Sequence, residues 1–182
     1  MKPSGLVTHG RALHKFFVRK YRARDVAPDG LTVLPGRQPY FNGPVGRNLV
    51  VQEGNHFILK CIRGTAGPLD ETNTFLGVGS DTTAPLRADK GLGGTYKYAA
   101  AEPTIKDGGN GEYYIESTAS FGANDANFLW SKATLCMDAD GLPTDDTVAA
   151  AINLGIALLE SDSDLTKQSG EAWMLTSRFS VW

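Results

Sequence analysis

The sequence has 182 residues, with 21 glycines, 9 prolines, 2 cysteines and a net charge of −2. A chain of this length can bury a core of its own, and two cysteines are too few for a secreted disulfide framework or a four-cysteine zinc site. The chain shows neither a signal-peptide pattern nor an apolar run of membrane-span length, so we expect no membrane partner and synthesis in a cytoplasm.

Charge divides the chain into two parts. Residues 1–47 carry nine Lys/Arg and two Asp, whereas residues 48–182 carry nine Lys/Arg and eighteen Asp/Glu. This asymmetry predicts an extended basic N-terminal arm over 1–47 and a single β-rich domain over 48–182. Whether the arm is only solvated or docks on an acidic surface is open, because charge patterning describes association rather than fold.

Within the arm, residues 14–22 (HKFFVRKYR) alternate as a strand does, but neither face is wholly apolar. We therefore expect this strand to find its partners outside its own domain. Residues 25–47 combine several prolines and glycines with scattered apolar positions. Because proline removes a donor and restricts the residue before it, this stretch is expected to be irregular.

One helix is predicted, over residues 48–64, starting at Asn48 or later, near Gln52. Its apolar positions fall on one helical stripe, at Phe57, Ile58, Cys61 and Ile62. Gly64 stands where a left-handed residue typically ends a helix. The two cysteines of the chain, Cys61 and Cys136, are predicted to be buried small hydrophobes.

Strand patterns follow the helix. Residues 74–80 form a short apolar run in which Gly77 and Gly79 are expected to let another backbone approach closely. A loop with Pro85 separates this run from a short strand at 95–100. The KDGGNG segment at 106–111 is a predicted turn, because Asp-Gly and Asn-Gly pairs favour tight turns.

Three longer strands complete the pattern. Residues 113–121 and 173–182 alternate cleanly, whereas 127–137 has large apolar residues on both faces. Residues 149–160 fit a helix or a strand, and Gly155 favours a strand from about Ile152. Together these elements predict a mainly β fold, an antiparallel β-sandwich or barrel-like domain with one helix and the N-terminal arm.

Catalytic and metal-binding patterns are missing from the sequence. It has no G-x-S-x-G elbow and no P-loop motif, and His9, His14 and His56 lie in the arm or the helix. The acidic turn at 138–146 has its glycine at the wrong position for a calcium-binding loop, and Ala149 stands where the loop needs a glutamate. We expect a non-enzymatic protein with no catalytic, cofactor-binding or metal-binding residues.

Candidate interface residues are aromatic or cationic. They are Phe16, Phe17, Arg19, Tyr21 and Arg22 in the arm, with Phe128 and Trp130 on an aromatic face of the strand 127–137. The arm residues also suit nucleic acid, since cations neutralise phosphates and rings stack on bases. Because the whole chain has a pI of about 5.9, protein docking is favoured and nucleic-acid binding is not expected.

Residues 47–94 resemble a module common in virion structural proteins of tailed bacteriophages. The matching positions are Asn48, Leu49, Gly54, Gly77, Gly79, Thr82, Thr83, Ala84, Pro85, Asp89 and Leu92. INLGIALLES at 152–161 and RFSVW at 178–182 are similar to the family's later strands. The resemblance covers residues 47–182, whereas the arm has no counterpart in it.

This resemblance implies a virion component with no cofactor, assembled in the host cytoplasm in multiple copies on the tail, the neck or the head. Its partners are then other copies of itself and other virion proteins. One alternative is a receptor- or carbohydrate-binding fibre or baseplate module that recognises a host surface glycan. Its stacking residues are Phe128, Trp130, Tyr96 and Tyr98. A further alternative is a capsid decoration protein.

Overall fold

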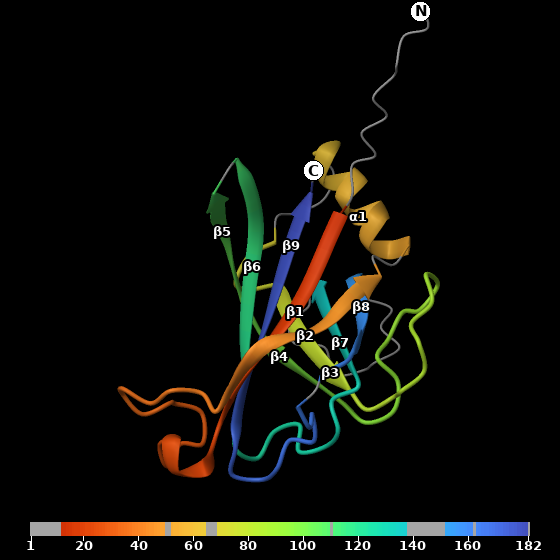
Figure 1. Ribbon diagram of the computed structural model, residues 1–182. Helices are drawn as coiled ribbons and strands as arrows, with labels where there is room; N and C mark the ends of the chain where they lie inside the picture. Colours follow the sequence, from red (N-terminus) through yellow and green to blue (C-terminus); the bar gives the residue numbers. More distant parts are fainter. Residues whose placement is uncertain are drawn as a thin grey trace, which may run out of the picture.

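A computed structural model describes residues 12–49, 52–64, 69–109, 111–137, 152–161 and 163–181. These residues form one antiparallel sheet in the order β4-β3-β7-β8-β2-β1-β9-β6-β5, with the helix α1 at one end (Figure 1). The elements are β1 (Ala12–Tyr21), η1 (Ala23–Asp25), β2 (Phe41–Leu49), α1 (Gln52–Ile62), β3 (Thr74–Gly79), β4 (Tyr96–Ala100), β5 (Glu102–Gly109), β6 (Glu112–Phe121), β7 (Lys132–Met137), β8 (Ile152–Leu159) and β9 (Ala172–Val181). The predicted mainly β, barrel-like fold with one helix is confirmed.

The sheet curls into a nearly closed barrel, as its two outermost strands show. β4 and β5 stand at opposite ends of the strand order, yet only Ala101 separates them in the chain. The Ala101 N–H still donates to the Thr74 carbonyl, at 2.9 Å, but beyond it the chain leaves β3 and pairs with β6. The barrel is therefore split at the α1 end, between β5 and the helix.

The core fills the barrel interior with inward-facing residues from successive strands. Phe16 and Val18 of β1 and Trp173 and Leu175 of β9 are all buried, as strand alternation requires. The same cluster contains Val45, Phe57, Leu76, Val78, Ala119, Phe121, Trp130, Ala133, Leu135, Leu154, Ala157 and Leu159. Burial of this apolar surface is the main force that holds the curled sheet together.

The predicted N-terminal arm is wrong for residues 12–47. β1 pairs with β2 on one side and with β9 on the other, so its partners lie within its own domain. β2 is a strand despite its glycines and proline, because the register shifts between Phe16 and Phe17 and Val45 becomes the buried extra residue of a bulge. Pro44 is tolerated at such a bulge, where ladder hydrogen bonding is interrupted. Residues 1–11 lie outside the described part of the chain.

Several boundaries differ from the sequence prediction. The helix starts at Gln52, the later of the two predicted starts, and Gly64 has the expected left-handed φ of 68°. β7 begins only at Lys132, so residues 127–131 precede the strand. β5 was not predicted, because EPTIKDGG has no apolar alternation. The segment that was ambiguous between helix and strand is the strand β8, as favoured.

Gly77 makes room for side chains, whereas Gly79 also lets a second backbone approach, as predicted, since a Cβ there would lie 3.2 Å from the Gly93 carbonyl oxygen. A Cβ at Gly77 would lie 2.5 Å from the Tyr98 ring, and one at Gly79 would lie 2.7 Å from the Leu92 Cβ. The loop between β3 and β4 accordingly folds over the outer face of the sheet. There Leu92 and Tyr98 pack against Phe75, Cys136 and Ile156 in a second buried cluster.

Gly54→Ala tests how closely α1 sits on β8. A Cβ at Gly54 would lie 2.0 Å from the Leu154 carbonyl oxygen, a backbone atom that cannot rotate away. Overpacking costs about 1–3 kcal/mol, and the gain of roughly 1 kcal/mol in helix propensity offsets only part of it. We expect Gly54→Ala to lower the urea midpoint and the exposed neighbour Asn55→Ala to raise it slightly. Equal rises for both variants would contradict this packing.

Candidate functional site

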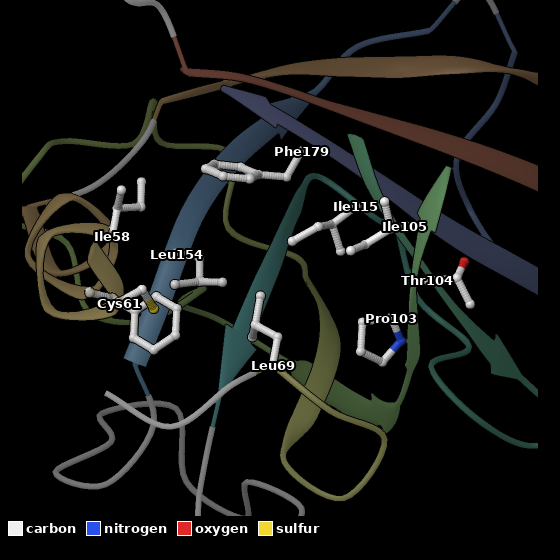
Figure 2. A pocket seen from close by; sticks show the side chains of 10 residues that line it. Ile58, Cys61, Leu69, Pro103, Thr104, Ile105, Ile115, Leu154 and Phe179 are labelled. Atoms are coloured by element: carbon white, nitrogen blue, oxygen red, sulfur yellow. The ribbon is translucent and has the colours of Figure 1, made fainter. Parts of the chain in front are cut away.

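An apolar groove lies between α1 and β5, where the barrel is split; we call it the α1–β5 groove. It has a volume of about 360 Å³. Figure 2 shows one wall built from the helix and β8 and the other built from β5, β6 and β9. The first wall contains Phe57, Ile58, Cys61, Leu69 and Leu154, and the second contains Pro103, Thr104, Ile105, Ile115 and Phe179.

The strand register explains the second wall. Ile105 pairs with Ile115, Ile115 pairs with Phe179, and Phe179 pairs with His14, which makes one row across β5, β6, β9 and β1. This row is buried at β1 but emerges into solvent at β5, where Ile105 is 78% exposed. Apolar side chains thus continue from the core to the open rim of the barrel.

The outer edge of β5 borders the groove. Among the described strands β5 pairs only with β6, so the backbone groups on its other side have no strand partner in that part of the chain. Such an edge is a template for pairing with another extended chain. An open strand edge beside an apolar groove combines backbone hydrogen bonding with pockets for alternate side chains, as β-strand addition requires.

The rim around this edge is acidic. The hairpin of β5 and β6 carries Glu102, Asp107, Glu112 and Glu116 but only one cation, Lys106. Glu116 accepts a hydrogen bond from Arg178 Nε at 2.8 Å, which leaves the other three carboxylates as exposed charges. The helix wall contributes the cations Lys60 and Arg63. The β5 side of the groove therefore favours a cationic partner.

A polar cluster lies next to the groove: His14 belongs to the row that lines it, and Ser177 and Ser117 lie one rung deeper in the barrel. His14 Nε2 lies 2.5 Å from Ser177 Oγ, and Ser117 is the cross-strand neighbour of Ser177. All three side chains are buried, and Ser117 Oγ is the one buried side-chain polar atom without a hydrogen bond in the described chain. The His14 ring also packs against Phe16, with ring centroids 4.5 Å apart.

This Ser–His pair does not have the properties of an activated nucleophile. Burial lowers the pKa of His14 from 6.5 to about 3, so the imidazole is neutral near pH 7 and does not accept a proton there. A general base works best when its pKa lies near the operating pH. Ser177 is also fully buried, out of reach of a substrate. The cluster is suited to structure rather than to acyl transfer.

Three buried lysines anchor loops to the barrel. Lys132 Nζ lies 2.6 Å from Asp81 Oδ2, which holds the pKa of that carboxyl at about 2. Lys167 Nζ donates to the Gly122 carbonyl and to Asn127 Oδ1, both at 2.7 Å, and burial lowers its pKa to about 8. The third, Lys20, lies between the rings of Phe41 and Trp173. Buried charges need such partners, because desolvation is otherwise costly.

Lys20 is enclosed by aromatic rings at the other end of the barrel. Its Nζ lies 4.6 Å from the Phe41 ring centroid and 4.4 Å from that of Trp173. The same atom donates to Ser163 Oγ at 2.9 Å and to the Asp164 carbonyl. Burial lowers the pKa of Lys20, against the opposing effect of nearby carboxylates. This lysine ties the β8–β9 loop to β1 and is satisfied internally.

Three of the seven predicted interface residues are buried inside the barrel, so their prediction as surface contacts is wrong. Phe16 and Trp130 are fully buried and Tyr21 is 6% exposed, so none of them is available to a partner. The reason for Phe16 and Tyr21 is that β1 is a central strand. Trp130 packs edge-on between Phe121 and Trp173, at centroid distances of 5.0 and 4.9 Å.

The other four predicted interface residues are at least partly exposed, but they do not gather at one place. Phe17 lies on the outer face of the barrel, where Arg178 Cζ stacks 4.6 Å from its ring centroid. Arg19 lies half-buried on β1, and Arg22 lies over the Tyr40 ring. Phe128 packs half-buried against the core. None of them lines the α1–β5 groove.

The groove residues were not singled out from the sequence. Alternation places Ile115 and Phe179 on inward faces, but the pairing of β6 with β9 joins segments about sixty residues apart. Cys61 was predicted to be buried; it is exposed and lines the groove, whereas Cys136 is buried as predicted. The helical spacing of Cys61 indicates an apolar stripe, but only the fold shows that this end of the stripe is exposed.

The predicted carbohydrate-stacking residues do not form an exposed platform. Trp130 is fully buried, and Tyr98 is 3% exposed beneath Gly77. The acidic turn 138–146 lies outside the described residues, and the residues that are described contain no cluster of His, Cys, Asp or Glu suited to a metal ion. No helix in the described ranges is long and apolar enough to cross a bilayer.

Comparisons with known proteins add no relative. No protein-family model, curated protein or solved structure matches this chain.

Proposed function

We propose that this chain is a non-enzymatic structural component of a tailed-bacteriophage virion, present in multiple copies on the tail, the neck or the head. Its partners are other copies of itself and other virion proteins. The observation that carries the proposal is the open edge of β5 beside the apolar α1–β5 groove. Strand addition at such an edge joins subunits without any catalytic chemistry.

The resemblance to virion proteins supports the same function. Gly77, Gly79 and Leu92, which carry part of it, pack together at the β3–β4 loop. Asp89 accepts a hydrogen bond from the Leu86 N–H within that loop, at 2.8 Å. These residues shape a loop of fixed form and supply no reactive group. A building block that presents a well-packed loop and an open strand edge fits these observations.

Particle composition tests the proposal. Tailed particles produced by cells that carry this gene are purified by density gradient and digested for mass spectrometry. We expect peptides of this chain to co-purify with particles in a fixed ratio to the main shell protein, and gold-labelled antibodies to mark one place on them. A chain found only in the soluble lysate, and never in particles, overturns the proposal.

A further inference from the structure

We propose that the α1–β5 groove receives residues 1–11 of a neighbouring copy, which add as a strand to the outer edge of β5. This inference rests on the proposed function and names the partner that its strand edge takes. The groove and the edge lie side by side, so an added strand gains backbone hydrogen bonds from β5 and burial of a side chain in the groove.

The sequence of residues 1–11, MKPSGLVTHGR, suits this place. Leu6 and Val7 form an apolar pair in its middle, and alternation turns one of them to each face of a strand. One of the two can therefore enter the groove beside Ile105. Lys2 and Arg11 are cationic and the segment has no acidic residue, which complements the carboxylates of the β5–β6 hairpin.

The position of β1 places this segment at the groove. β1 begins at Ala12, and its residue His14 pairs with Phe179, which lines the groove. β1 therefore begins at the end of the barrel that holds the groove. A neighbour stacked at that end presents its own leading segment to the same rim.

Reach favours the neighbour over the segment's own groove. Following the sheet from β1 past β9 and β6 to a position beyond β5 covers four strand spacings, about 19 Å at ~4.8 Å each. Crossing that distance takes about six extended residues, which leaves too few to pair along the eight residues of β5. A segment from a second copy does not have to span this distance, so all of its residues can pair with β5.

Cys61 gives a direct test, because it is exposed and lines the groove while Cys136 is buried. The donor is the full chain with Cys61→Ser and either Leu6→Cys or Val7→Cys. The acceptor is the unchanged full chain. With oxidised glutathione added as the oxidant, a disulfide between residue 6 or 7 and Cys61 can form only between two molecules, and peptide mass spectrometry identifies it.

We expect one donor of the two to form this disulfide at least about tenfold faster than a Leu31→Cys donor, because docking raises the effective concentration of the thiols. Leu31 is 52% exposed and lies in the loop after η1, at the end of the barrel away from α1 (Figure 1). Ile105→Asp in the acceptor is expected to cut the rate about tenfold, whereas Leu86→Asp, exposed but outside the groove, leaves it unchanged.

Three results overturn the inference. One is a disulfide that forms only within a single chain when Leu6→Cys or Val7→Cys is combined with native Cys61, since the segment then fills its own groove. Another is a rate no faster than that of the Leu31→Cys donor. The third is a rate that Ile105→Asp does not change. If any of these results is found while the chain is present in particles, the inference is wrong but the proposed virion function is retained. If the chain is absent from particles, the proposed function itself is wrong.

Discussion

Trp130→Ala is expected to lower the free energy of unfolding by about 3–5 kcal/mol. Trp130 is fully buried and packs edge-on against Phe121 and Trp173. Its Nε1 also donates to the Ala126 carbonyl at 2.9 Å. The substitution leaves a large cavity, breaks two aromatic contacts and removes the donor of a buried hydrogen bond. Urea unfolding followed by far-ultraviolet circular dichroism measures the loss.

The neighbouring Leu129→Ala is the matched control. Leu129 is 43% exposed, so its truncation is expected to change stability by less than about 0.5 kcal/mol. If Trp130→Ala unfolds at the same urea concentration as the wild type and instead weakens binding to another protein, Trp130 is a surface contact after all and its placement here is wrong.

Trp130 also shows where sequence reasoning failed. Residues 127–137 alternate as one long strand would, which puts Phe128 and Trp130 on a shared outer face. The strand begins only at Lys132, because the chain turns at Ala126, where φ is 53°. The preceding segment then folds inward and Trp130 enters the core. A positive φ at an alanine depends on tertiary packing and leaves no mark in the local pattern.

Other elements were predictable because their local pattern and their tertiary role agree. Trp173, Leu175 and Phe179 alternate through β9, and all three are buried on one face of the strand. Gly64 ends the helix with the left-handed φ that its position indicated. Consistency between local preference and global fold is what makes such segments readable from sequence.

β2 and β5 lacked that agreement. Gly43, Pro44 and Gly46 argue against a strand, yet β2 lies between β1 and β8, and its bulge accommodates the proline. A Cβ at Gly46 would lie 2.7 Å from the Leu158 carbonyl oxygen, so this glycine permits the close pairing of β2 with β8. β5 is polar because it is an edge strand that faces solvent.

The groove could not be predicted from sequence for a related reason. It brings together Phe57 of the helix, Ile105 of an edge strand and Phe179 of the last strand. In its own segment each residue fits a common local pattern: Phe57 a helix stripe, Ile105 a polar run and Phe179 a strand face. Only the split of the barrel after Ala101 turns them into one surface. The site therefore depends on the topology of the sheet rather than on a motif.

The stability of the barrel is expected to fall by roughly 2–3 kcal/mol between pH 7.5 and pH 4.5, because His14 is buried in its neutral form. The pKa of His14 is about 3 in the folded chain and 6.5 in the unfolded chain. Between these values the unfolded state binds one more proton, so stability is complete above pH 6.5 and decreases as the pH falls, by about 1.4 kcal/mol per unit. The urea midpoint at successive pH values measures this loss.

His14→Gln is expected to flatten this dependence, since glutamine does not titrate, while the exposed His56→Gln keeps it. The window ends at pH 4.5 because the carboxylates with lowered pKa, such as Asp81 and Asp70, stay ionised above it. If His14→Gln does not fold, nuclear magnetic resonance of the wild-type protein provides the test, because the chemical shifts of the imidazole nitrogens report the protonation of His14. A His14 ring that titrates near pH 6.5 in the folded protein contradicts its burial next to the groove.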